Sequence, residues 1–599
     1  MSRLFLDVRQ SACGRVWRDR LDERATARAL AIAQRHGVSE LLARVLAGRD
    51  VEPDAVEEFL DPTVRRLMPD PDVLTDMPKA ATRIADAIEG HERIAIFGDY
   101  DVDGATSSAV LAKFLRHAGS DPLIHIPDRL FEGYGPNTEA VRALAEKGAR
   151  LLITVDCGTT SIAPLAEAKA LGLDVVTIDH HQADEALPPV DALVNPNRQD
   201  DLSQLNHLAA VGLVFMTVVA VNRELRKRNF WHVLRPEPDL LDSLDLVALG
   251  TVADVVPLKG LNRAFVSKGL IAMRRREHVG LTALMDAARL TGPPESWHLG
   301  FLLGPRINAG GRIGRADLGV RLLLEEDAAL AGGMAAELDR LNRERQAIEQ
   351  QTVAEAEAEA MAALGIEEKG AVVVSAGQGW HPGVVGLVAA RLKERFGRPA
   401  FAIALEPSGI GTGSGRSITG VDIGAAVRHA VASGLLIKGG GHAMAAGVTI
   451  APDKLAPFRA YLEEALHVDV EKARLEDVLL IDGAISAGGA NVAMLADIAR
   501  AGPFGAGHAE PVFALPAHQI AYAEEVGQAH VRARLRSGDG AMLNAIAFRA
   551  AGKPLGKALL DNRGRNMHAA GNLVIDRWNG EERVQFRLMD VASVEPVAR

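Results

Sequence analysis

The sequence predicts an α/β protein with a doubly wound parallel sheet, a long linking helix, a smaller α/β domain and a C-terminal β-barrel of the OB type. Three observations predict this architecture. Apolar runs in the first half each end in acidic or histidine residues, with helix-like stretches between them, which is the pattern of βαβαβ units. A proline-free run rich in Ala and Glu follows, and the last part of the chain contains short alternating strands.

The chain is long enough for several domains. Its 599 residues, 48% of them hydrophobic, should fold into about three to five domains that each bury a core. We expect the boundaries where the residue pattern changes, giving a helical extension (1–70), the doubly wound domain (71–325), the linking helix (326–365), the smaller α/β domain (366–470) and the OB-like domain (471–599).

A dense group of carboxylates follows the first apolar run, Ile94–Phe97. Asp99, Asp101 and Asp103 occupy alternate positions at the carboxyl end of the expected strand, where open α/β sheets bind ligands. Like charges this close require a cation or several donors, although a solvated turn is the alternative for an isolated motif. A calcium loop would need Glu where Val110 stands, so the hard oxygen ligands favour Mg²⁺ or Mn²⁺.

Two further apolar runs end in the same way. Residues 151–155 are followed by Asp156, and residues 174–178 by Asp179, His180 and His181. Helix-like stretches at 138–147 and 162–171 separate the strands, so the strands should be parallel. Because parallel strands end at the same edge of a sheet, these side chains can meet although they are far apart in the sequence.

Asp254 adds another acidic position. It is the lone charged residue of the apolar stretch 250–258, so a carboxylate buried there needs a partner or a metal ion. Taken singly, Asp156 could be a helix N-cap, His181 a surface histidine and Asp254 a cap before Pro257. The joint pattern favours a metal site at one edge of the sheet.

Residues 328–364 predict the linking helix. They contain long runs of Ala, Glu, Arg and Gln without proline, and with Gly332-Gly333 near the start we expect one helix from Met334. A coiled coil is the weaker alternative, because apolar heptads are not sustained beyond about two. Such a helix can separate two lobes as a spacer.

The smaller α/β domain carries two glycine-rich segments. Strands at 371–375 and 399–405 should flank a helix at 384–396. Arg416 and Ser417 follow Gly409–Gly415 and can offer a guanidinium and backbone N–H groups to a phosphate. The segment Gly439-Gly440-Gly441-His442 can bring its backbone close to the same chain, whereas the glycines of 409–415 alone would indicate only a flexible loop.

The last domain contains a basic strand. Residues 531–536 alternate, with three arginines on one face, and Asn579-Gly580 predicts a hairpin turn between strands at 573–578 and 583–591. Residues 516–599 carry 12 Lys/Arg against 9 Asp/Glu, although the whole chain has a net charge of −11. We therefore expect nucleic acid to bind in local basic grooves, with a merely solvated strand face as the alternative.

Several classes of protein are excluded. The two cysteines, Cys13 and Cys157, cannot build a disulfide framework, and no C-x-x-C pair is present. The N-terminus lacks the apolar core of a signal peptide, and the longest apolar run, 208–221, is too short to cross a bilayer. We expect a cytoplasmic protein without a membrane partner.

The motifs together resemble those of a known family. Asp99–Gly104, Asp156, Asp179-His180-His181 and Asp254 resemble the four motifs of the DHH phosphoesterase superfamily. Other segments narrow the resemblance to the RecJ-type exonucleases, which degrade single-stranded DNA from the 5′ end; they are 304–314, 380–386, 413–417, 439–443 and 503–511. The resemblance covers roughly residues 75–599 in the right order, with His508 where the family usually has Asn.

The resemblance implies two divalent metal ions, Mg²⁺ or Mn²⁺. One ion would use Asp101 and Asp156, and the other Asp103, Asp156, His180 and Asp254, with Asp156 bridging. The remaining three residues of the motifs would act around the ions: Asp99 would orient or buffer the cluster, Asp179 would fix the imidazole of His180, and His181 would donate to the scissile phosphate.

The resemblance also implies a substrate and a reaction. Arg129 would contact phosphate near the metals, while Arg306 and Arg312 would close the pocket around a terminal 5′ phosphate. The expected activity is metal-dependent 5′→3′ hydrolysis of single-stranded DNA to 5′-mononucleotides in DNA repair and recombination. A single-strand-binding protein and a helicase are candidate partners.

Two other functions compete with this one. Relatives that hydrolyse small substrates carry a metal-binding His four residues before the first ligand Asp, where this chain has Phe97, and they lack residues 471–599. A replication scaffold that has lost activity would have no physical need for complete metal motifs.

Overall fold

The computed structural model describes residues 3–129, 131–365, 369–475, 477–527, 529–578 and 581–594, so the expected turn Asn579-Gly580 lies outside the described residues. The chain divides into two compact units, one formed by Val64–Glu476 and the other by Met1–Thr63 together with Asp477–Arg599. Among the described helices, none combines the length and the apolar character needed to span a membrane.

A five-stranded parallel sheet forms the base of the larger unit. Its strands are β2 (Ile94–Gly98), β3 (Leu123–His125), β4 (Leu151–Val155), β5 (Asp174–Ile178) and β6 (Ala192–Val194), arranged in the order β3-β2-β4-β5-β6. The chain first moves outward from β2 to β3 and then returns to the other side at β4. The strand order therefore reverses between β2 and β4, which is the position where doubly wound sheets bind ligands.

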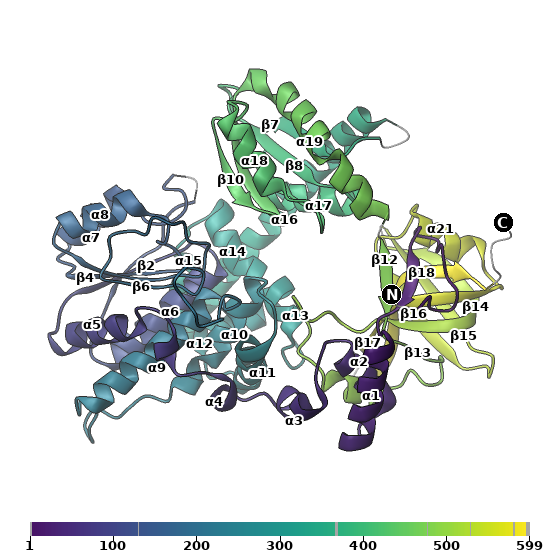
Figure 1. The fold of residues 1–599 in the computed structure, drawn as a ribbon, viewed down its shortest axis with the longest axis horizontal. Coiled ribbons are helices and arrows are strands. Elements are labelled where there is room, and N and C mark those ends of the chain that lie inside the picture. Colours follow the sequence, from purple (N-terminus) through teal and green to yellow (C-terminus); the bar gives the residue numbers. More distant parts are fainter. Residues whose placement is uncertain are drawn as a thin grey trace. The chain divides into compact units, whose positions relative to one another are not determined.

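Helices cover both faces of this sheet (Figure 1). The helices α7 (Thr138–Glu146) and α8 (Ile162–Ala170) pack on one face, against strand residues such as Phe97 and Leu152. The other face carries α5 (Met77–Glu89), α6 (Val102–His117) and α9 (Ala210–Lys227), against Ile96 and Ile153. Alternate residues of each buried strand thus enter opposite cores, which explains why the strands are apolar throughout.

A helical layer extends the second core. It consists of α10 (Leu244–Ala253), α11 (Gly260–Arg275), α12 (Val279–Ala287), the short α13 (Ser296–His298), the π-helical turn η4 (Leu299–Leu303), α14 (Gly304–Ile313) and α15 (Leu318–Leu324). Gly250 lets α10 approach α6 closely, because a Cβ there would lie 2.3 Å from Thr106 Oγ1 and 3.1 Å from Asp103 Oδ1. This close contact brings the C-terminal end of α10 to the sheet edge.

The long helix α16 runs over Ala328–Leu364, and thus starts six residues before the expected Met334. Asp327 caps it by accepting hydrogen bonds from the backbone of Ala329 and Leu330, and the two glycines lie inside the helix with open space where a Cβ would stand. Its buried residues recur every three or four positions, from Ala331 to Ala360. Packing along this stripe compensates for the low helix propensity of the glycines.

A mixed five-stranded sheet follows α16. Its order is β10-β11-β9-β8-β7, with bounds β7 (Val373–Gln378), β8 (Ala400–Leu405), β9 (Gly411–Arg416), β10 (Lys438–His442) and β11 (Ala445–Ile450). The helices α17 (Val385–Phe396), α18 (Ile423–Ala432) and α19 (Leu455–Leu475) accompany it. The expected domain boundary at 470 falls inside α19, since no proline or glycine follows Pro457 of its first turn.

The smaller unit is a closed barrel with helical additions. The barrel has five strands, which pair in the order β14 (Phe513–Val526), β15 (His530–Arg536), β16 (Met542–Ala547), β18 (Glu581–Ser593) and β17 (Asn566–Trp578). Pairing of β17 with β14 closes the barrel. Residues 1–63 contribute β1 (Val16–Asp19), α1 (Glu23–His36) and α2 (Glu40–Ala47), and β1 pairs in parallel with β12 (Val478–Ile481). The part expected as an extension thus shares a core with the barrel.

Candidate metal centre

The first three carboxylates stand where β2 passes into α6. Asp101 is the N-cap of α6 and accepts a hydrogen bond from Gly104 N at 3.1 Å, while Asp103 lies in the first turn. Gly104 is required for space, because a Cβ there would lie 2.4 Å from Asp99 O. The backbone of Ala210 and Val211, at the start of α9, donates to both oxygens of Asp103 at 2.7 and 2.9 Å. The start of a helix favours a negative charge, so α9 orients this carboxylate.

Asp156 follows β4 directly, on the strand next to β2. Its side chain is buried and its backbone adopts φ 62°, in the left-handed region that Asp tolerates better than most residues. This conformation turns the chain sharply at the point where the strand order reverses. Asp99, Asp101 and Asp156 can offer one oxygen each within 4.8 Å of one another.

His180 presents a free nitrogen to the carboxylates. Its Nδ1 lies 3.1 Å from the carbonyl of Leu208, and since a carbonyl only accepts, Nδ1 carries the proton. Nε2 lies 3.3 Å from Asp156 Oδ1 and 3.6 Å from Asp254 Oδ2. Burial, followed by the charge of His181, lowers the pKa of His180 to about 4. The neutral ring therefore offers a lone pair, as a metal-ligating histidine does.

Asp179 holds the neighbouring histidine rather than His180. Its Oδ1 accepts hydrogen bonds from the backbone of both histidines and from His181 Nδ1 at 2.8 Å, and its Oδ2 accepts from Thr159 N. Burial alone would lower the pKa of His181, but the hydrogen bond to Asp179 and the surrounding carboxylates raise it to about 9. The sequence had assigned Asp179 to the imidazole of His180, whose ring is instead fixed by Leu208.

Asp254 comes from a helix end, not from a strand. It caps the C-terminus of α10, and its side chain is 21% exposed. Burial and mutual repulsion raise the pKa of Asp103 to about 7, and raise those of Asp99, Asp156 and Asp254 well above the usual value. One buried oxygen of each of the last three has no hydrogen-bond partner in the described part of the chain. The cluster is thus short of positive charge.

Three supporting side chains are not among the residues that the sequence predicts for the site. The Tyr134 hydroxyl donates to the carbonyl of Asp156 at 3.2 Å and lies 3.0 Å from His181 Nδ1. The buried Asn195 donates to Thr159 Oγ1 and to the carbonyl of His181 at 2.8 and 2.9 Å, and Asn197 donates to the carbonyl of His180. A signal for the asparagines is present in the sequence, since they follow the apolar strand β6 at the same sheet edge.

Three of the predicted phosphate ligands converge. Arg129 stacks over the Tyr100 ring with its Cζ 5.2 Å from the ring centre, and Arg312 Nη1 donates to the carbonyl of Gly383 at 2.9 Å. Burial, followed by Arg129, Arg345 and Arg416, lowers the pKa of Arg312 to about 10. Burial and Arg129 also lower the pKa of Arg416. The mutual lowering of these pKa values shows that the guanidinium groups lie close to one another, an arrangement that can bind an anion.

The other predicted phosphate ligands are placed differently. Arg306 is bound to Asp339 of α16 at 2.9–3.0 Å, so it braces that helix. Ser417 is buried and its hydroxyl donates to the carbonyl of Val421 at 2.7 Å. His442 pairs with Ala445, which pairs with Arg416, so His442 and Arg416 share one row across β10, β11 and β9. Gly440 and Gly441 are exposed on the edge strand β10 beside this row.

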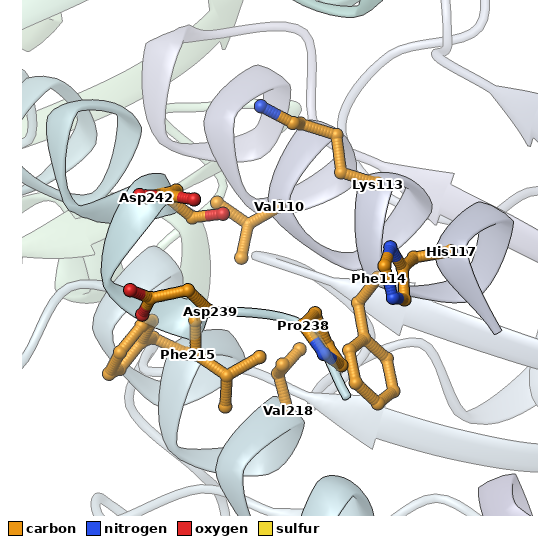
Figure 2. A pocket seen from close by; sticks show the side chains of 11 residues that line it. Val110, Lys113, Phe114, His117, Phe215, Val218, Pro238, Asp239 and Asp242 are labelled. Atoms are coloured by element: carbon orange, nitrogen blue, oxygen red, sulfur yellow. The ribbon is translucent and has the colours of Figure 1, made fainter. Parts of the chain in front are cut away.

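A cavity of about 230 Å³ lies farther along the helices that hold Asp103 (Figure 2). Phe114 of α6 and Phe215 and Val218 of α9 line its apolar side, and Lys113 and Asp242 stand on its rim. It does not include any of the predicted site residues. Its floor belongs to the core that positions the starts of α6 and α9.

Comparison with known proteins agrees with this architecture. Family profiles match at residues 93–251 (DHH family, N-terminal domain), 369–468 (DHHA1 domain) and 481–590 (RecJ OB domain). The chain is 36% identical over 565 residues to the single-stranded-DNA-specific exonuclease RecJ of Dickeya dadantii, covering 91% of this chain and 95% of that protein. The corresponding protein of Escherichia coli is 35% identical, with 91% and 94% covered.

Solved structures agree as well. The crystal structure of RecJ from Thermus thermophilus in complex with Mn²⁺ superposes with a TM-score of 0.77 at 29% identity, covering 96% of this chain and 78% of that one. A second RecJ structure bound to manganese is 35% identical, with a TM-score of 0.57 and coverage of 68% and 97%. This chain therefore belongs to the RecJ single-stranded-DNA-specific exonucleases of the DHH superfamily.

Proposed function

We propose that this protein hydrolyses single-stranded DNA from the 5′ end to 5′-mononucleotides, using two divalent metal ions. The observation that carries the proposal is the cluster of buried carboxylates with unpaired oxygens beside the free Nε2 of His180. A second cluster, of arginines, supplies a phosphate site in the same compact unit.

The donor set fits Mg²⁺ or Mn²⁺. Hard oxygens dominate it, the one nitrogen is an imidazole, and cations would relieve the repulsion that raises the carboxylate pKa values. We assign Asp101 and Asp156 to one ion, and Asp103, Asp156, His180 and Asp254 to the other. Asp99 reaches the first group with an unpaired buried oxygen, so we propose it as an additional ligand there. Such ions supply a nucleophile at neutral pH and compensate charge on the phosphate.

His181 is the donor that faces the substrate. Its Nδ1 is held by Asp179, whereas its Nε2 has a long contact of 3.4 Å to the Tyr134 hydroxyl. The side chain of His181 is 44% exposed, whereas that of His180 is only 13% exposed. An N–H donated from this position would stabilise charge on the phosphate or protonate the leaving oxygen. Tyr134 and Asn195 hold the ring and its backbone in place.

The arginines position the strand. Arg129, Arg312 and Arg416 form the phosphate site, and the row from Arg416 to His442 extends it along the mixed sheet. Binding of the terminal 5′ phosphate at Arg416 would place the next phosphodiester at the metals and release one nucleotide at a time. Arg306 is omitted from this site because its guanidinium is bound to Asp339.

The two compact units would have different roles, one in hydrolysis and the other in DNA binding. Val64–Glu476 would cleave, while the barrel unit would hold the strand through exposed arginines of β15. We further propose that the protein acts in DNA repair and recombination and is located in the cytoplasm. Its partners would be a single-strand-binding protein and a helicase.

A digestion experiment tests the direction and the metal requirement together. Single strands labelled at the 5′ or the 3′ end are incubated with Mn²⁺, with Mg²⁺ or with a chelator. We expect 5′ label to appear at once as mononucleotide, 3′ label to shorten progressively, and the chelator to stop both. Early release of 3′ mononucleotide, or cleavage in the chelator, would contradict the proposal. Pyrophosphate and dinucleotides in parallel test the small-substrate alternative, which the fully buried Phe97 already disfavours.

A further inference from the structure

The residue after Asp254 has an unusual backbone. Val255 adopts φ 63°, in the left-handed region where a β-branched residue is a genuine outlier. It stands just past the C-cap of α10, a position that helices usually fill with glycine when the chain turns left-handed. Elsewhere in the chain, the left-handed residues at helix ends are glycines, such as Gly37 and Gly397 at φ 61°, or residues that are not branched at Cβ, such as Arg276 at φ 56°. Among the described residues, Val255 is the one β-branched residue with a positive φ.

Burial does not explain a valine at this position. The Val255 side chain is 70% exposed, although it follows a helix whose first eight residues are buried. A glycine there would remove both the backbone strain and the exposed apolar surface. Backbone strain that is retained beside a functional site indicates that the side chain of the strained residue has a function there.

A second exposed apolar side chain stands on the neighbouring element. Phe301 is 81% exposed and lies in the π-helical turn η4, a kind of turn that recurs at functional sites. At Gly300 a Cβ would lie 3.5 Å from Val252 Cγ1, and at Gly304 it would lie 3.4 Å from Ala253 Cβ and 3.8 Å from Val102 Cγ2. The turn thus lies against the ends of α10 and α6 that carry Asp254, Asp101 and Asp103.

We propose that Val255 and Phe301 form an apolar platform that contacts the bases of the nucleotides flanking the scissile phosphate. Every base has an apolar face, so such a platform would bind single strands without reading their sequence, while paired and stacked bases would not be available to it. The proposal rests on the proposed nuclease function and adds the residues that hold the bases beside the metals.

The first test separates strain from function at Val255. In Val255→Gly the melting temperature should rise because the strain is relieved, while kcat/KM on single-stranded DNA should fall about fivefold or more. Gly37→Val is the matched reverse control, with open space for its side chain, and should lower the melting temperature without changing kcat/KM. A stabilised Val255→Gly enzyme with unchanged kcat/KM would overturn the proposal, and so would a lowered melting temperature.

The second test asks whether bases are contacted. Phe301→Ala should lower kcat/KM about tenfold on an ordinary strand, but little on a strand whose first three nucleotides are abasic, because that substrate already lacks the stacked partners. Leu234→Ala, which removes a side chain that is 90% exposed on a distant hairpin segment, should change neither value. An equal loss on both strands, or no loss, would overturn the platform. Absence of hydrolysis by the unaltered enzyme would instead refute the proposed function.

Discussion

The carboxylates at the parallel sheet edge and the arginines around Arg312 are two clusters of like charge, and they differ in how far the protein itself satisfies them. Buried oxygens of Asp99, Asp156 and Asp254 have no hydrogen-bond partner among the described residues. The arginines have acceptors, since Arg312 donates to the carbonyl of Gly383 and Arg416 donates to Ser414 Oγ and to the carbonyl of Gly415.

This difference matches the ligand that each cluster would take. Unpaired carboxylates need a resident cation, because only a cation lets all of them ionise in one buried place. Guanidinium groups that already donate hydrogen bonds to backbone carbonyls keep their positions without a ligand, so they can bind a phosphate and release it again. The comparison therefore predicts tight metal binding at the first cluster and reversible substrate binding at the second.

The largest expected effect comes from breaking the acidic cluster. Asp156→Ala removes the oxygen shared by both ions, so kcat should fall by about three orders of magnitude, equal to several kcal/mol at about 1.4 kcal/mol per tenfold. Metal content, measured by mass spectrometry, should fall with it, while affinity for single strands survives. The control Asp242→Ala removes an acid on the cavity rim and should change none of these values. More than about a tenth of the original rate would argue against a bridging role.

A smaller loss should follow from removing the donor beside the cluster. His181→Ala should lower kcat about a hundredfold or more, which is typical of a lost general acid, with the metal content unchanged. Metal content and kcat are measured on the same preparation. Loss of one ion would show that His181 is a ligand. Asn195→Ala, which removes the support of the His181 carbonyl, should lie between this variant and the unaltered enzyme.

The arginine cluster should give an effect that depends on the substrate. Arg416→Ala removes a charged contact worth about 1.5–3 kcal/mol, so kcat/KM should fall about ten- to a hundredfold on 5′-phosphorylated strands. If the contact is terminal, strands with a 5′-hydroxyl should lose much less. The control Arg306→Ala breaks the ion pair with Asp339 and should lower stability while leaving the ratio between the two substrates unchanged. Equal losses on both substrates would indicate an internal phosphate contact.

The smallest effect is expected on the barrel, which belongs to the other compact unit. Arg532 is bound to Glu524 and Arg536 to Gln519. The exposed Arg534 stands between Tyr522 and Asn544 in the strand ladder. Arg534→Ala should weaken binding of long single strands a fewfold and reduce the slope of log K against log salt by about 0.7. Fluorescence anisotropy at several salt concentrations measures both. An unchanged slope would mean that this strand face is merely solvated.

Local sequence patterns predict the secondary structure elements whose formation depends on neighbouring residues. The apolar runs at 94–97, 151–155 and 174–178 are three of the five strands of the parallel sheet, whereas β3 and β6 were not predicted, and the run from Ala328 is one helix. That helix starts six residues earlier than the low helix propensity of Gly332 and Gly333 predicts, because Ala331 and Ala335 are buried by packing. Asp254 was expected at the sheet edge and reaches it from a helix, a route that needs the close approach at Gly250.

By itself, the sequence determined three of the five strands of the parallel sheet, their parallel orientation and the acidic and histidine residues that end them, because apolar runs and short motifs are encoded over a few neighbouring residues. Only the tertiary structure decided which nitrogen of His180 is free, since Leu208 lies on another element. It also decided that Arg312 joins the phosphate site while Arg306 does not, and that residues 1–63 pack with the barrel. These outcomes depend on contacts between residues far apart in the chain, which no local pattern records.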